Sequence, residues 1–247
     1  MKKSLCLLLL VLICPVKLEA QRIVEQKLLI DLPTAGTLER GSFNIDLRMF
    51  ENGGLLGGIE VGITPRFMFG ISYGGENIIG EGDVNWNPSP GFQARIRILD
   101  EYFSTPAITL GFNSQGYGPY DNTLNRYAIK SRGFFAVASK NYAILFNLGL
   151  HGGINYSLEN NDNDDDINFF FGADFSFNRE IRFIIEYDLA LNDNNDQEYG
   201  SGNGYLNAGL QWCFSNRLFL EFNLKNILEN GAANTRREFK IGYLEFF

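Results

Sequence analysis

Cysteine, histidine and basic residues are scarce in this sequence. Of three cysteines, Cys6 and Cys14 fall in an apolar N-terminal stretch and Cys213 stands alone, so no disulfide framework is available once that stretch is removed. The 21 basic residues are outnumbered by 29 acidic ones, which argues against nucleic acid or an anionic lipid surface as the main partner. Proline is absent from the interior of every predicted strand, as ladder hydrogen bonding requires.

Phenylalanine, tyrosine and glycine are abundant instead, at 22, 11 and 27 residues, which favours strands and tight turns. The N-terminus has the form of a secretory signal. Met1-Lys2-Lys3 precedes the apolar run Leu5 to Val16, which is too short to span a bilayer as a helix, and the small residue Ala20 offers a cleavage site. Loss of residues 1–20 removes three lysines and one glutamate and moves the net charge from −8 to −10.

The rest of the chain alternates between apolar and polar positions. In 167–177, phenylalanines and Ala173 fall on one side and Asn168, Gly172, Asp174 and Ser176 on the other, with Phe170 as the exception. In 181–191, Arg182, Ile184, Glu186, Asp188 and Ala190 occupy the second side. Similar runs begin near Phe43, Leu55, Phe67, Phe92, Ala107, Tyr127, Ile144, Leu206, Leu218 and Phe239. About twelve strands result, many of the ~9–11 residues that a tilted transmembrane strand needs.

The connections between these runs alternate in length. Long gaps at 226–235, 192–203, 158–166, 114–125 and 75–90 alternate with short ones at 215–216, 178–180, 140–142, 100–104 and 64–65. Only the tight gap at 51–54 breaks the order. Outer-membrane barrels have short periplasmic turns and longer extracellular loops.

We therefore predict an all-β protein, an antiparallel up-and-down transmembrane β-barrel of about 12 strands in the bacterial outer membrane. The signal peptide covers 1–20, a periplasmic N-terminal lead-in covers 21–40 and the barrel covers 41–247, with both barrel termini in the periplasm. A soluble secreted β-sandwich binding protein is the alternative, because it also alternates apolar and polar positions.

The partners expected of such a barrel are outer-membrane lipid and lipopolysaccharide, and no nucleic acid. The last strand ends on Phe247 and resembles the terminal signature that barrel-assembly machinery reads. Glu245 occupies a position where an apolar residue is usual. Two aromatic loops, 75–90 and 114–120, predict outer-loop contacts with polysaccharide through Trp86, Tyr117 and Tyr120, or an interfacial aromatic girdle.

The polar face predicts a lumen lined by charges of both signs. Its proposed members are Asp46, Arg48, Glu60, Arg95, Arg97, His151, Asp174, Arg182, Glu186, Asp188, Glu221 and Lys225. A lumen of twelve strands is intermediate between a filled and an open barrel, so the sequence leaves open whether a pore remains.

No catalytic, cofactor or metal site is predicted. His151 is the only histidine, and Ser157 on the same face lies six residues away, roughly 20 Å along a strand. The acidic stretch 159–166 fails the EF-hand template, because Ile167 and Ala173 stand where a glycine and a glutamate belong. It is interpreted as a solvated outer loop, with weak divalent bridging to lipopolysaccharide as the alternative.

Three segments are similar to the YjbH family of outer-membrane barrels associated with exopolysaccharide production: Glu60 to Arg66, Trp86 to Gly91, and Thr105 to Ile108 leading to Gly111-Phe112. The family's members are typically longer, so this chain resembles a single-barrel relative. The resemblance implies a non-enzymatic role in surface polysaccharide export or assembly. A small porin or channel is the first alternative function.

Overall fold

The computed structural model describes residues 25–144, 146–194, 200, 202–231 and 234–247. The predicted signal peptide at 1–20 lies outside the described residues. None of the described residues forms a helix long and apolar enough to cross a membrane.

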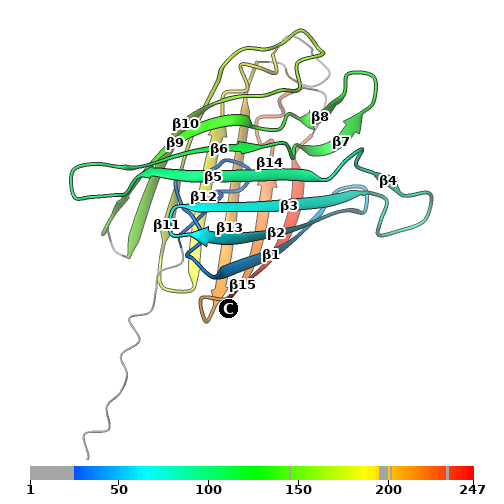
Figure 1. Ribbon diagram of the computed structural model, residues 1–247. Coiled ribbons are helices and arrows are strands. Elements are labelled where there is room, and N and C mark those ends of the chain that lie inside the picture. The colour runs from blue at the N-terminus through cyan, green and yellow to red at the C-terminus, as the bar shows by residue number, and fades with distance from the viewer. Residues whose placement is uncertain (1–24, 145, 195–199, 201, 232–233) are drawn as a thin grey trace, which may run out of the picture.

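Within the described residues, twelve strands of 7–11 residues form one closed sheet (Figure 1). They are β1 (Ser42–Phe50), β2 (Gly54–Thr64), β3 (Phe67–Glu76), β5 (Gly91–Leu99), β6 (Ala107–Asn113), β9 (Gly133–Tyr142), β10 (Asn147–Tyr156), β11 (Asn168–Ser176), β12 (Ile181–Asp188), β13 (Tyr205–Phe214), β14 (Leu218–Lys225) and β15 (Arg236–Phe246). The short β4 (Asn85–Trp86) pairs with the last two residues of β3, and β7 (Tyr117–Asp121) pairs with β8 (Arg126–Ile129) as a separate hairpin.

Each wall strand pairs antiparallel with its neighbours, and the first strand pairs with the last. β1 bonds β2 on one side and β15 on the other, in a register that places Ser42 opposite Phe246. The sheet therefore has no free edge, which is the arrangement that a bilayer demands of strands. The up-and-down barrel is confirmed, and the alternative of a β-sandwich is wrong.

The two faces of the wall differ as the alternation predicts. Outward-pointing residues such as Phe171, Ile185 and Leu210 are 53%, 39% and 49% exposed, because nothing in the chain covers them. Their neighbours on the inner face, such as Glu186, are buried. A closed barrel that is apolar outside and polar inside has the architecture of an outer-membrane protein.

Long and short connections alternate around the barrel, except at the tight connection 51–53. The short connections are 65–66, 100–106, 143–146, 177–180 and 215–217, and the other connections are 51–53, 77–90, 114–132, 157–167, 189–204 and 226–235. We refer to the two ends as the short-turn end and the long-loop end. The barrel strand expected to begin near Tyr127 begins at Gly133 instead, because 126–129 fold back onto β7.

The C-terminal strand carries the unusual Glu245 on its outer face, where Arg217 of a short turn binds it at 2.6 Å. The hydroxyl of Tyr243 donates to the same carboxylate at 2.7 Å. The Phe247 ring lies 5.1 Å from that of Phe43. The polar group at this position thus lies at the rim of the short-turn end, where it has its own partners.

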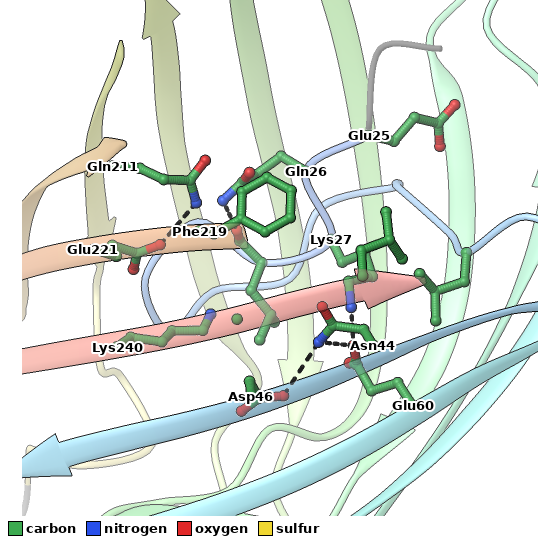
Figure 2. Close-up of a pocket in the computed structure, with 14 residues that line it drawn as sticks. Glu25, Gln26, Lys27, Asn44, Asp46, Glu60, Gln211, Phe219, Glu221 and Lys240 are labelled. Carbon is green, nitrogen blue, oxygen red and sulfur yellow. Dashed lines mark hydrogen bonds and ion pairs between the residues drawn. The ribbon is translucent and has the colours of Figure 1, made fainter. Parts of the chain in front are cut away.

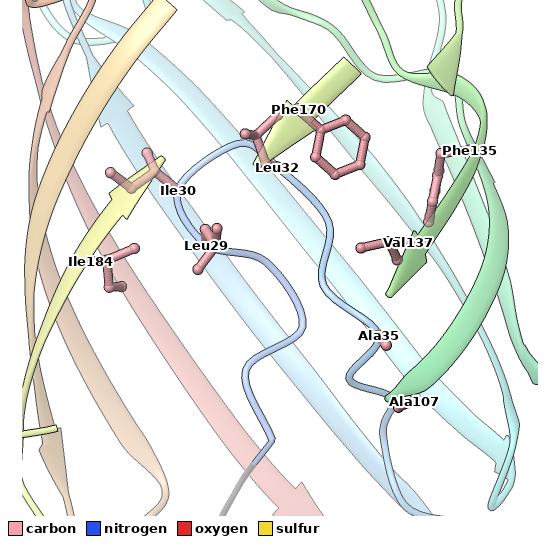
Figure 3. Packing of buried hydrophobic residues seen from close by; sticks show 9 residues of the cluster. All are labelled: Leu29, Ile30, Leu32, Ala35, Ala107, Phe135, Val137, Phe170 and Ile184. Atoms are coloured by element: carbon pink, nitrogen blue, oxygen red, sulfur yellow. The ribbon is translucent and has the colours of Figure 1, made fainter. Parts of the chain in front are cut away.

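The largest departure from expectation is the segment before β1. The sequence predicts a periplasmic lead-in, but residues 27–38 form a tight turn inside the barrel (Figure 3). Leu29, Ile30 and Leu32 are 1%, 0% and 1% exposed. We call residues 25–41 the plug. It lies inside because its apolar side chains are shielded there from water by the apolar residues of the inner wall.

A charge on the outer face should therefore destabilise the barrel. We expect Ile185→Lys, at the middle of β12, to lower the free energy of unfolding by about 2–4 kcal/mol. Ile79→Lys, at a position that is 58% exposed in a long loop, is the control and should change it by less than about 0.5 kcal/mol. Urea unfolding in lipid vesicles measures both. Equal effects of the two variants would contradict a lipid-facing position of Ile185.

Candidate functional site: a plugged lumen

The twelve residues proposed for the lumen all lie on the inner face of the wall. Nine of them are buried, and Asp46, Arg97 and Arg182 are half-buried. They do not surround an open water-filled space. Most contact the plug or a neighbouring side chain of opposite charge.

Glu186 binds the tip of the plug through the backbone. Its carboxylate accepts hydrogen bonds from the N–H groups of Ile30, Asp31 and Leu32 at 2.9–3.1 Å. Asn207 donates a fourth at 2.7 Å. Consecutive N–H groups that converge on one anion form a strong charge-assisted site. The plug tip is thereby fixed to β12 and β13.

Asp31 at the same tip joins a buried cluster of four charges. Its two carboxylate oxygens lie 2.8 Å from Arg48 Nη1 and 2.6 Å from Lys225 Nζ. Both cations also approach Glu238, at 3.4 and 3.3 Å. Arg48 in addition donates to the carbonyl of Ile30 at 2.7 Å. The wall supplies two cations and one anion, and the plug supplies the second anion.

The returning arm of the plug is held through the peptide group of Ala35. Its N–H donates to Ser139 Oγ at 2.8 Å. Its carbonyl accepts from Thr109 Oγ1 and Arg97 Nη2, both at 2.9 Å. On the entering arm, Arg95 donates to the carbonyl of Lys27 at 2.8 Å, and the Lys27 ammonium pairs with Glu60.

Apolar residues on the inner face of the wall pack against the apolar side chains of the plug (Figure 3). Phe170 and Ile184 belong to the same buried cluster as Leu29, Ile30 and Leu32. These two wall residues are the ones that break the polar alternation of their strands. Gly172 leaves room beside them, because a Cβ atom there would lie 2.5 Å from Leu29 Cδ1.

His151 is bonded to two side chains that lie far from it in the sequence. Its Nδ1 is 2.7 Å from Ser139 Oγ and its Nε2 is 2.8 Å from Asp174 Oδ1. The serine that sequence analysis considered, Ser157, is not involved. Serine, histidine and aspartate in mutual contact also make up hydrolytic triads. Here the Ser139 hydroxyl already accepts the Ala35 N–H, so the plug covers the atom that would act as nucleophile.

Two small cavities lie deep in the lumen, one between the plug and the wall and one between the β7–β8 hairpin and the wall, and a wider cavity of about 430 Å³ lies at the base of the plug. Figure 2 shows the first, near the short-turn end, where Lys27 of the plug faces Asn44, Glu60 and Lys240 of the wall. It leaves about 60 Å³ for the centres of water molecules, which is room for a few waters. The second lies toward the long-loop end and leaves about 30 Å³. Along β1 the first ends at Asp46 and the second begins at Arg48, so the four-charge cluster lies at the boundary.

The long-loop end is covered by the hairpin of β7 and β8. Tyr117 is 8% exposed and its ring lies 4.7 Å from the Arg48 guanidinium and 4.6 Å from Lys225 Nζ. Arg126 at the base of β8 is fully buried and pairs with Asp162 and Asp193. The hairpin therefore narrows the lumen at the long-loop end and leaves the second cavity beside it.

The acidic stretch 159–166 is only partly the solvated loop that sequence analysis expects. Asp162 and Asp164 turn inward, where Lys130 Nζ bonds the Asp162 carboxylate and the Asp164 carbonyl at 2.8 Å. Burial raises the pKa of Asp162, but the hydrogen bonds and charges of Lys130 and Arg126 outweigh it and leave that pKa below its usual range. Among the described residues, no group of acidic, histidine or cysteine side chains is arranged to hold a metal ion.

The three aromatic residues proposed as outer-loop contacts do not form one surface. Trp86 is 54% exposed and stacks on Tyr73 at 5.6 Å, outside the wall as in an interfacial girdle. Tyr120 packs edge-on against Tyr127 at 5.0 Å. Tyr117 points into the lumen. A shared sugar platform of Trp86, Tyr117 and Tyr120 is therefore absent from this conformation.

The comparisons with known proteins do not identify a family. No family model matches the chain, and no curated protein matches it. A KdgM porin is 11% identical with a TM-score of 0.49, covering 83% of this chain and 99% of that one. A NanC porin is 10% identical with a TM-score of 0.47, covering 83% and 99%. An outer-membrane channel from Pseudomonas putida F1 is 10% identical with a TM-score of 0.46, covering 85% and 97%.

These likenesses carry no inference about a substrate. The resemblance to the YjbH family stays a prediction. Its three segments lie along β2 and the turn after it, along β4 and the loop before β5, and along β6.

Replacing the carboxylate that binds the plug tip should loosen the plug. In Glu186→Gln the amide N–H groups would face the backbone N–H groups of the tip, and we expect a loss of about 2 kcal/mol or more in plug binding. Trypsin should then cleave after Lys27, which is half-buried in the native protein. Glu221→Gln is the matched control, since the buried Glu221 accepts its hydrogen bonds from Gln211 and Asn223, which are side chains of the wall. Equal cleavage of both variants would contradict this role of Glu186.

The covered serine should have no hydrolytic function. We expect purified protein to release p-nitrophenol from short-chain esters at the background rate, both as the native chain and as Glu186→Gln, in which the plug is loosened. Adding Ser139→Ala to Glu186→Gln should leave that rate unchanged. Activity that appears in Glu186→Gln and disappears in the double variant would show that Ser139 is a nucleophile when uncovered.

Proposed function

We propose that the protein is a small outer-membrane channel whose passage is closed by the plug and opens when the plug leaves the lumen. This is the alternative that sequence analysis placed beside polysaccharide export, and the arrangement of the interior favours it. The short-turn end, from which the plug enters, is taken as periplasmic by the rule for connection lengths.

The observation that carries the proposal is the way in which the plug is attached. Among the described residues, 25–38 make no backbone–backbone hydrogen bond with the wall. Such bonds are confined to the junction with β1, where Ser42 N–H donates to the Glu39 carbonyl, Gly41 N–H donates to the Gly62 carbonyl and the Gly41 carbonyl accepts from Phe247 N–H. Every other polar contact with the wall runs through side chains. The plug can therefore leave without breaking the sheet.

The wall behind the plug is suited to water. Arg48, Arg95, Arg97, Glu186 and Lys225 would be solvated once their plug partners left, and charged side chains of both signs line water-filled barrels. Smaller barrels are filled by side chains of the strands themselves. Here the filling is a separate segment with an exposed base at Glu25, Glu39 and Arg40, which is the part that a periplasmic factor would reach.

A reversible lock tests the proposal. Ala35 of the plug and Thr109 of the wall are in contact, with Ala35 O and Thr109 Oγ1 2.9 Å apart. We expect Ala35→Cys/Thr109→Cys, in a Cys213→Ser background, to form a disulfide that abolishes channel openings in planar bilayers. Reduction should restore them, to a level above that of the native chain because the Thr109 hydrogen bond is lost.

The two single-cysteine variants are the controls and should open with or without reductant. In the same assay Glu186→Gln should open more often than the native chain, by roughly 30-fold for a 2 kcal/mol loss. Openings that persist in the oxidised double variant would place the ion path outside the lumen and overturn the proposal.

A further inference from the structure

We propose that Arg48 and Lys225 form a binding site for a carboxylate-bearing solute that reaches them from the long-loop end and competes with Asp31 of the plug. This deepens the proposed channel function and rests on it. Asp31 is then an internal ligand that holds the site until a solute carboxylate takes its place.

The site is built into the wall and not into the plug. Arg48 belongs to β1, Lys225 to β14 and Glu238 to β15. Arg48 and Lys225 are 2% and 6% exposed. The Tyr117 ring lies against both cations at 4.7 and 4.6 Å. Two cations fixed by a ring and a carboxylate keep their positions when the plug leaves.

Charge balance requires an anion at this place. With Asp31 bound, two cations face two carboxylates. Without it, Glu238 alone faces both cations, and it lies farther from them, at 3.4 and 3.3 Å against 2.8 and 2.6 Å for Asp31. The nearby Arg132 and Arg236 have their own partners in Asp188 and Glu51. A buried cation without a partner is strongly unfavourable.

The second cavity provides access from the long-loop end. Arg48, Lys225 and Tyr117 are buried members of its lining, Glu51 is half-buried and Arg237 is exposed. Gln115 and Tyr127 add an amide and a hydroxyl between them. A solute entering here meets the two cations before it meets the plug. Its carboxylate takes over the ion pairs of Asp31, so that the plug tip keeps only its bonds to Glu186 and Arg48.

Chemical rescue of a full-length variant tests the site. Asp31→Ala removes the carboxylate and leaves a gap in front of Arg48 and Lys225. We expect this variant to lose heat-modifiable migration at a lower temperature than the native chain and to open more often in bilayers. Sodium acetate should restore both properties at least tenfold better than acetamide, which has the same shape without the charge.

Two further variants separate this site from general charge effects. Lys225→Gln added to Asp31→Ala should abolish the rescue by acetate. Lys240→Gln is the matched control, because Lys240 is a second lysine of the inner face that lines the first cavity and not the second. It should leave the rescue intact.

The result for the carboxylate site can be distinguished from the result for the channel function. Rescue of heat-modifiable migration by acetate, lost only with Lys225→Gln, supports the site even if no variant conducts ions, in which case only the proposed channel function fails. The site is overturned if acetamide rescues as well as acetate, if Lys225→Gln has no effect, or if Asp31→Ala folds neither with acetate nor without it.

Discussion

The carboxylate of Glu186, held inside the barrel by three successive backbone N–H groups of the plug, is the interaction on which the interior depends. A buried carboxylate without donors is strongly disfavoured, and the strands cannot supply N–H groups that already bond their neighbours. The plug tip offers them from a tight turn, with Leu29 N–H bonded to the Leu32 carbonyl at 2.9 Å. The same turn presents Asp31 to Arg48 and Lys225. One short segment thus pairs with charges of both signs on different strands of the wall, an anion on β12 and cations on β1 and β14.

The strands of the wall were predictable because each strand has an apolar environment on one face and a polar environment on the other. Hydrocarbon outside and polar groups inside impose a period of two that the sequence displays directly, and connection length then gives the strand order. The prediction went wrong where that contrast disappears. Residues 127–132 lie over the mouth of the barrel, and almost every side chain there is buried, so an alternation of environments no longer distinguishes a wall strand from a folded loop.

The contents of the lumen were not predictable in the same way. The alternation of apolar and polar residues predicts which side chains face inward. It does not predict which side chains they contact, because the sequence of one strand does not determine its register with the neighbouring strand. Ser139 lies directly opposite His151 in the register of β9 and β10, and neither strand's sequence fixes that pairing. A signal for the plug was present nonetheless. Phe170 and Ile184 are apolar residues on a polar face, and the apolar residues Leu28, Leu29 and Ile30 precede the barrel. Each of these features suggests that something apolar lies inside.

The pairing of β1 with β15 bears on how the molecule is assembled. The plug is joined directly to β1, and the seam between β1 and β15 is the only one that joins strands from the two ends of the wall. While this seam is open, the hairpin at 27–34 can settle sideways against the curved sheet. After it has closed, the hairpin has to thread lengthwise through the rim at the short turns. The closure of β15 on β1 therefore decides whether the plug docks sideways or must reach its place by threading.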